Sequence, residues 1–145
     1  MGEILQIFLT SSLTIVGGVF IYTTGEVLSR FIIEPIHEQR KLIGEISDTL
    51  IYYANIFYHY TSIDSKAEKA EREIRSLSTR LRAKTGIIPL YSTWEKLKWV
   101  PTERDISKAT TALIGLSNSV YGKGGHDHVE AYRKEISEAL DIDVQ

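Results

Sequence analysis

Side chains that could carry chemistry are few in this chain. His126, Asp127 and His128 follow a glycine-rich loop and offer nitrogen and oxygen atoms of the kind that bind zinc. Three neighbouring ligands do not complete a tetrahedral site, and neither His37 nor His59 can be placed beside them from the sequence. The sequence therefore predicts an exposed loop here and no metal site.

Two glycine motifs resemble known catalytic or phosphate-binding patterns only in part. Gly115-Leu116-Ser117 matches the start of a nucleophile elbow, but the second glycine is missing and the motif lies in a predicted helix. The glycine run at 122–125 follows a helix and matches neither nucleotide-binding fingerprint. Because no converging set of titratable groups is evident, we predict no enzyme activity and no cofactor.

Basic residues form the one remaining candidate for a binding site. They are Arg40, Lys41, Arg80, Arg82 and Lys84. Three of them end a predicted helix, where the helix dipole favours positive charge, so a solvated surface explains them without a ligand. The alternative is a site for an anion, such as a lipid headgroup or a nucleotide phosphate. The net charge of −2 and pI near 6.1 predict no nucleic acid partner.

The most prominent feature of the sequence is an apolar run at the N-terminus. It covers residues 4–33 and carries no charge between Glu3 and Glu26. About 22 uncharged helical residues cover roughly 33 Å, which is enough to cross a lipid bilayer. A cleaved signal peptide is less favoured, because a basic start and a small-residue cleavage site are missing. We predict a transmembrane anchor over residues 1–33.

Charges on either side of this run predict its orientation. Arg30, His37, Arg40 and Lys41 follow the run, whereas only Glu3 and the terminal amine precede it. The positive-inside rule then places the N-terminus outside and the C-terminal part in the cytoplasm. The chain has no cysteine and so no disulfide, which is compatible with a cytoplasmic domain.

One side of the apolar run is polar. At 100° per residue, most of the small and hydroxylated residues fall within an arc of about 160°, which Ile7 and Ile21 interrupt. The residues that define this polar face are Thr10, Ser11, Thr14, Gly17, Gly18, Thr24 and Gly25. Such a face allows close packing of helices in lipid, so we expect a homo-oligomer or docking on another membrane protein. The alternative is the wall of a polar pore in a ring of copies.

The rest of the chain predicts an all-α fold class: one N-terminal transmembrane helix followed by a small cytoplasmic helical bundle over residues 34–145. Apolar residues recur at helical spacing over 36–60, 65–86, 102–120 and 127–140. Pro35 predicts a kink or a new helix start. Thr102 and Asp127 are expected to cap the last two helices.

The segment 87–101 carries large side chains between two prolines, in the run IIPLYSTWEKLKWVP. Ser92 or Thr93 is expected to cap a short helix in it. We expect Trp94 and Trp99 to pack over the open end of the bundle. The alternative places the rings of Tyr91, Trp94 and Trp99 at the level of the lipid headgroups, where amphipathic aromatic side chains collect.

Three stretches together resemble a widespread group of small bacterial membrane proteins. They are FIIEPIHEQRKLIGEISDTLIYYANI after the apolar run, LSTRLRAKTGIIPLY, and LIGLSNSVYG towards the C-terminus. The resemblance covers roughly residues 15–122. It implies a protein of the bacterial inner membrane with a cytoplasmic helical domain, and it transfers no catalytic or binding residue.

The function predicted from these observations is that of a single-pass, membrane-anchored helical protein. It acts by self-association or by docking a partner rather than by catalysis. The first alternative is an oligomeric membrane effector or channel that opens on a signal sensed in the cytoplasmic domain. An enzyme is the least favoured alternative.

Overall fold

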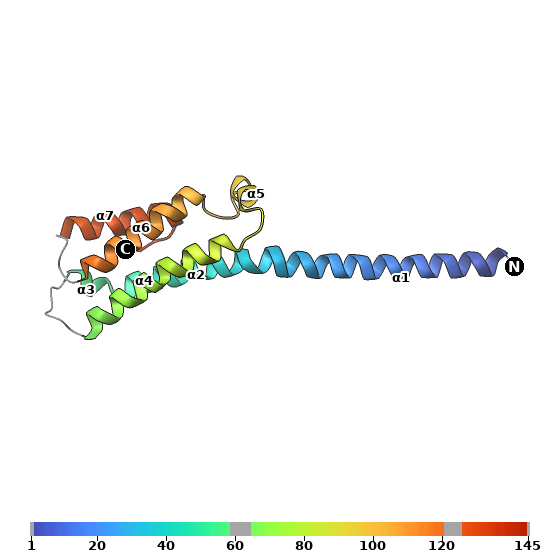
Figure 1. Cartoon of the computed structure of the whole chain (residues 1–145), viewed down its shortest axis with the longest axis horizontal. Coiled ribbons are helices and arrows are strands. Elements are labelled where there is room, and N and C mark those ends of the chain that lie inside the picture. The colour runs from blue at the N-terminus through green and yellow to red at the C-terminus, as the bar shows by residue number, and fades with distance from the viewer. Residues whose placement is uncertain (1, 59–64, 121–125, 145) are drawn as a thin grey trace. The chain divides into compact units, whose positions relative to one another are not determined.

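The structure is a computed structural model that describes residues 2–58, 65–120 and 126–144. These residues form helices and no strand, which confirms the predicted all-α fold (Figure 1). The chain divides into two compact units, Met1–Glu34 and Pro35–Gln145. His59 and the predicted glycine loop at 122–125 lie outside the described residues.

The first unit is a helix without a core of its own. It consists of α1 (Gly2–Leu28) and η1 (Ser29–Ile33), and no residue of α1 is buried. Among the described residues, one helix near the N-terminus is long and apolar enough to cross a membrane. Glu26 and Arg30 form an ion pair at 2.7 Å, one helical turn apart.

Helical conformation continues past Pro35 into α2 (Glu34–Tyr52). The α-helix α2 itself begins at Glu34, next to this proline, without a break in helical conformation. The η1 segment just before α2 is a π-helix, in which the N–H of Glu34 donates to the carbonyl oxygen of Ser29. Proline has no N–H to donate, so regular α-helical hydrogen bonding is interrupted at this point of the chain.

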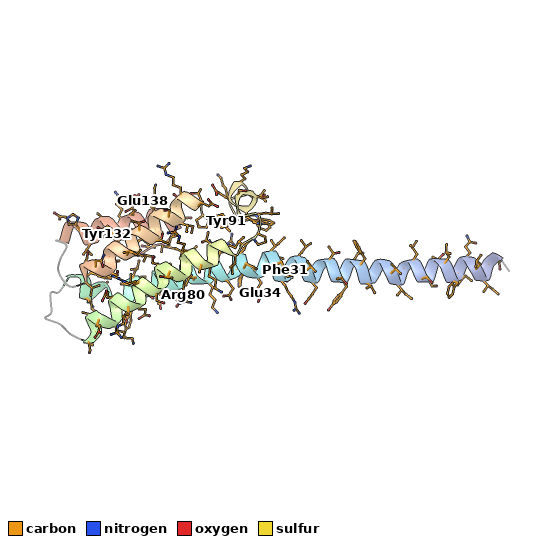
Figure 2. The ribbon with its side chains drawn as sticks, viewed as in Figure 1. Phe31, Glu34, Arg80, Tyr91, Tyr132 and Glu138 are labelled. Carbon is orange, nitrogen blue, oxygen red and sulfur yellow. The ribbon has the colours of Figure 1, made fainter. Side chains whose placement is uncertain are left out.

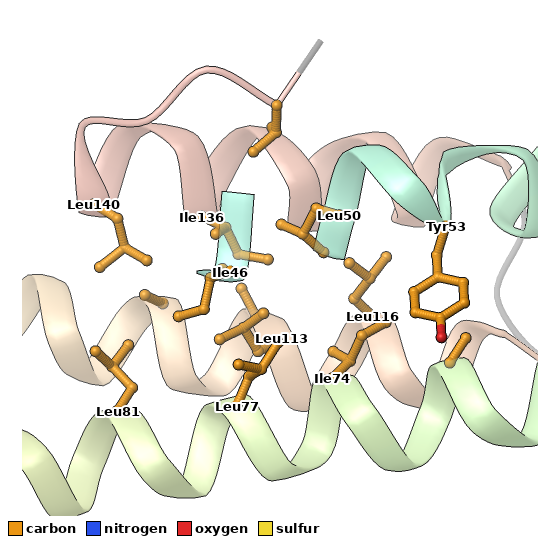
Figure 3. Packing of buried hydrophobic residues seen from close by; sticks show 14 of the residues in the cluster. Ile46, Leu50, Tyr53, Ile74, Leu77, Leu81, Leu113, Leu116, Ile136 and Leu140 are labelled. Atoms are coloured by element: carbon orange, nitrogen blue, oxygen red, sulfur yellow. The ribbon is translucent and has the colours of Figure 1, made fainter. Parts of the chain in front are cut away.

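The second unit is a bundle of four longer helices around one core. They are α2, α4 (Ser65–Gly86), α6 (Glu103–Ser119) and α7 (His126–Leu140), and α6 packs against both α4 and α7 (Figure 1). Each helix buries an apolar stripe, which is the arrangement expected of a bundle. Figure 3 shows the core side chains Ile46, Leu50, Ile74, Leu77, Leu81, Leu113, Leu116, Ile136 and Leu140, all of them buried.

Two predicted features of the bundle helices need correction. The long helix expected over 36–60 is broken at Tyr53, and a short helix, α3 (Ala54–Tyr58), follows the break. α7 begins at His126, so Asp127 lies in its first turn and does not cap it. The other predicted cap is confirmed, because the Thr102 hydroxyl accepts the N–H of Asp105 at 3.0 Å.

The short helix α5 (Tyr91–Lys96) also differs from the prediction. It begins one residue after Leu90, which has the left-handed backbone conformation with φ of 54°. Ser92 and Thr93 therefore lie inside the helix instead of capping it. Helix geometry ends before Trp99 is reached.

Gly115 lets α6 and α7 approach closely. A Cβ atom at this position would lie 2.5 Å from Cζ of Tyr132, whose ring is partly buried against the core (Figure 2). Gly44 in α2 is also helical, but a Cβ atom there would meet nothing within 4 Å. The two glycines therefore differ in the space around them.

We expect Gly115→Ala to lower the free energy of unfolding by about 1–3 kcal/mol, because the Tyr132 ring must move out of its packed position. Gly44→Ala is the matched control and should raise it by up to about 1 kcal/mol, since alanine favours helix more than glycine. Urea denaturation of the full chain in detergent, followed by circular dichroism, measures both changes.

The same substitution in a Tyr132→Ala background tests the stated cause. Without the ring, Gly115→Ala should be neutral or stabilising. An equal cost in both backgrounds would contradict the packing explanation.

Candidate functional site

The polar face lies on α1 as predicted, and none of its residues is buried within the chain. The Thr10 hydroxyl donates to the carbonyl oxygen of Gln6 at 2.7 Å, and the Thr14 hydroxyl donates to that of Thr10 at 2.9 Å. Each hydroxyl proton is thus satisfied inside the helix, while the oxygen can still accept a hydrogen bond from a neighbour.

The glycines of the polar face make no close contact with the described residues that would require a glycine. A Cβ atom on Gly17, Gly18 or Gly25 would meet nothing within 4 Å. Glycine inside a helix costs about 1 kcal/mol relative to alanine. This cost therefore has no compensating contact within the described part of the chain.

A buried hydrogen-bond network fixes the segment between α4 and α6. The Gln39 side chain is fully buried, and its Nε2 donates to Oγ1 of Thr85 at 2.7 Å and to the hydroxyl of Tyr91 at 3.1 Å. The Tyr91 hydroxyl donates to the Pro101 carbonyl oxygen at 2.7 Å, and the Thr85 hydroxyl donates to that of Leu81 at 2.8 Å. Both hydroxyls have used their protons, so they can only accept from Gln39.

Burial within this network raises the pKa of Tyr91, so its hydroxyl remains a donor at physiological pH. Gln39 is a functional residue that sequence reasoning missed. The sequence signal that could have identified it is its helical spacing: Gln39 lies three residues before Leu42 and seven before Ile46, and both are core residues of the same helix.

The two tryptophans lie in the segment that this network holds. Arg40, next to Gln39, donates from Nη2 to the carbonyl oxygen of Trp99 at 2.8 Å. The Trp94 and Trp99 rings stack with centroids 5.3 Å apart, and Nε1 of Trp94 donates to the Pro89 carbonyl oxygen at 3.0 Å. Trp94 is partly buried and Trp99 is 51 % exposed, so these rings cover the bundle only in part.

The predicted basic residues do not form one cluster. Arg80 makes a two-pronged ion pair with Glu45 at 2.6 and 2.9 Å, and Lys84 bonds Glu38 at 3.0 Å. The hydrogen bond and charge of Lys84 hold the pKa of Glu38 below its usual range. These two cations on α4 are thus matched by acids on α2, and an anion site there stays a prediction.

The other predicted basic residues lie apart from these pairs. Arg82 lines a hollow of about 400 Å³ beside Tyr91 and Ser107. Lys41 is exposed on α2. Arg40 lines a second hollow of about 440 Å³, whose rim also carries Lys98 and acidic residues from α6 and the C-terminal segment. The mixed charge of that rim favours neither a cation nor an anion.

The C-terminal segment is bound to the bundle. Arg133 donates to the carbonyl oxygen of Val144, and the Ser47 hydroxyl donates to that of Asp143 at 2.8 Å. Val144 is buried in the core.

Catalytic chemistry finds no support in the described residues. Within residues 2–58, 65–120 and 126–144, no three His, Cys, Asp or Glu residues gather to hold a metal ion. Asp127 and His128 are exposed in the first turn of α7. Ser117 is fully buried and its hydroxyl donates to the Ile114 carbonyl oxygen at 2.8 Å, so it is not placed as a nucleophile.

Tyr53 joins the core to the surface of α4. Its ring is buried, and its hydroxyl donates to Oε2 of Glu73 at 2.7 Å. Burial and, secondarily, the bond to this carboxylate raise the pKa of Tyr53 to about 12. Tyr52 contacts the ring edge-on at a centroid distance of 4.9 Å and is itself 75 % exposed.

Comparisons of the sequence with protein-family models, curated proteins and solved structures found no match. The resemblance to small bacterial membrane proteins therefore stays a prediction.

Removing one hydroxyl tests the buried network. Tyr91→Phe should lower the free energy of unfolding by about 1–3 kcal/mol, because the Pro101 carbonyl oxygen and one N–H of Gln39 lose their partner. Urea denaturation measures the change. Tyr52→Phe is the control and should have almost no effect, and equal effects of the two substitutions would contradict the proposed network.

Alkaline pH tests the Tyr53–Glu73 contact. The folded chain holds the Tyr53 proton to about pH 12, whereas the unfolded chain releases it near pH 10. The stabilisation is therefore complete below pH 10 and is lost as the pH rises from about 10 to 12.

The difference between wild type and Tyr53→Phe isolates this contribution, because other groups titrate equally in both. Their free energies of unfolding should converge as the pH rises through this window. A constant difference would contradict the raised pKa of Tyr53.

Proposed function

We propose that this protein is a single-pass, membrane-anchored helical module that acts by self-association or by docking another membrane protein. Contact is made through the polar face of α1 rather than by catalysis. The observation that supports this most strongly is that Gly17, Gly18 and Gly25 have no contact within the chain that requires glycine.

The exposure of α1 supports this proposal. No residue of α1 is buried, although most of its side chains are large and apolar. Lipid supplies the missing apolar environment for the face that carries Leu9, Val16 and Phe20. On the polar face, glycine allows the backbone of a second helix to approach closely, and the gain in packing offsets the weak helix propensity of glycine.

The location follows from the charge pattern and the resemblance given above. We place the protein in the bacterial inner membrane, with its N-terminus outside and the bundle in the cytoplasm. Arg30, Arg40 and Lys41 on the bundle side support this orientation.

A channel is the second candidate function, because hydroxyls on one face of several copies could line a polar path. The Thr10 and Thr14 protons already bond the carbonyl oxygens of their own helix, so these groups do not require water. This favours dry packing over a pore. Dye release from liposomes that contain the full chain tests the alternative, and sustained release would favour the channel.

Bulky residues on the polar face should weaken self-association. Gly17→Leu combined with Gly18→Leu is expected to reduce the association constant in lipid at least about tenfold, because the helix backbones can no longer approach. Energy transfer between labelled copies of the full chain in vesicles measures this constant.

Val16→Leu combined with Val19→Leu is the matched control, since these residues lie on the opposite arc and should tolerate added bulk. Unchanged association in the glycine variant, or equal losses in both variants, would contradict self-association through the polar face. Association only with a different membrane protein would favour docking.

A further inference from the structure

We infer that the exposed side chains around Trp99 form a membrane-docking patch that binds the headgroup layer of an anionic bilayer. The patch consists of Ile87, Leu90, Leu97 and Trp99, which are 51 to 71 % exposed. This inference rests on the proposed membrane anchor, but it assigns to the bundle a contact with lipid that the anchor alone does not require.

The patch is costly for the folded chain. Four large apolar side chains face solvent within 13 residues of sequence, from 87 to 99. Leu90 and Lys98 also have left-handed backbone conformations, with φ of 54° and 57°, which are unfavourable for residues other than glycine. The four exposed side chains are not buried within the described part of the chain, so contact with lipid would give them an apolar environment.

The network at Gln39 holds the patch in place. Tyr91 is bonded to Gln39 and to Pro101, and Arg40 holds the Trp99 carbonyl oxygen. The backbone on both sides of the patch is thus tied to the first turns of α2, and little ordering is needed on binding.

Charge identifies the partner as a lipid surface. Lys96 and Lys98 are exposed between the apolar members of the patch, and Lys41 is exposed on α2. Glu95, Asp105, Glu138 and Asp141 also line the hollow beside Trp99, so the attraction rests on Lys96 and Lys98, which lie among the apolar members of the patch. Exposed lysines among tryptophan and leucine match anionic headgroups above acyl chains.

Chain length makes this contact possible. Arg40, which holds Trp99, follows Ile33 by seven residues, and seven residues span at most roughly 25 Å. Ile33 ends the apolar run, so only a short stretch of chain separates it from Arg40. Because the chain is anchored in the same membrane, the effective concentration of lipid at the patch would be high.

Tryptophan fluorescence tests the inference, because the chain has only two tryptophans. The full chain with Trp94→Phe, which leaves Trp99 as the single emitter, is placed in vesicles of phosphatidylcholine and phosphatidylglycerol. Lipids with bromine near the top of the acyl chains should quench Trp99 strongly, and lipids with bromine near the chain ends should quench it weakly. Emission that no brominated lipid quenches would overturn the inference.

Charge reversal tests the anionic partner. Lys96→Glu combined with Lys98→Glu should reduce the quenching at least about twofold in anionic vesicles, and high salt should act in the same direction. Lys66→Glu combined with Lys69→Glu is the matched control, since these exposed lysines lie at the other end of α4 from Gly86. Equal effects of both pairs, or none of either, would overturn the inference.

Resistance to alkaline carbonate extraction separates this inference from the proposed anchor. A chain that stays in the washed membrane while Trp99 is not quenched contradicts the patch alone. A chain that is extracted contradicts the anchor.

Discussion

Apolar side chains that the chain cannot bury are the constraint on which the rest depends. No residue of α1 is buried, although this helix is long and apolar enough to cross a bilayer. The hydrophobic effect requires an apolar environment for such a surface, and the chain does not supply one. In the proposed membrane anchor, lipid and a second helix supply this environment, and the polar face on α1 is the side that meets the second helix.

In the second unit, the helices bury most of their apolar side chains against one another. Four amphipathic helices bury their apolar stripes against one another, and the core that results needs no partner. Some large apolar side chains stay exposed, and four of them, Trp99 among them, lie in the segment after α4. Polar contacts at Gln39 and Arg40 tie this segment to α2.

Several of the polar side chains considered as candidates have partners within the chain. Arg80 and Lys84 are paired with acids, and Ser117 is buried with its hydroxyl bonded to the helix backbone. The polar groups that are buried stabilise connections between helices, as at Gln39 and Tyr53.

The sequence by itself determined the helices and most of the core, because an apolar stripe with a period of 3.6 residues is local information. The buried positions of Ile46, Leu77 and Leu113 follow from that stripe alone. Helix ends were less predictable: the break at Tyr53 and the start of α7 depend on neighbours far along the chain. Pro35 was tolerated because a π-helical segment precedes it.

Only the tertiary structure decided which side chains meet. The bond of Gln39 to Tyr91 joins residues 52 positions apart, and the pair of Arg80 with Glu45 joins residues 35 positions apart. No periodicity in the sequence encodes such pairs, since they arise from how the helices turn against one another. For the same reason the exposure of Trp99 could not be derived from the sequence, because an aromatic side chain in a short segment satisfies both a core and a surface pattern. Folding resolved that ambiguity by leaving the ring outside the core.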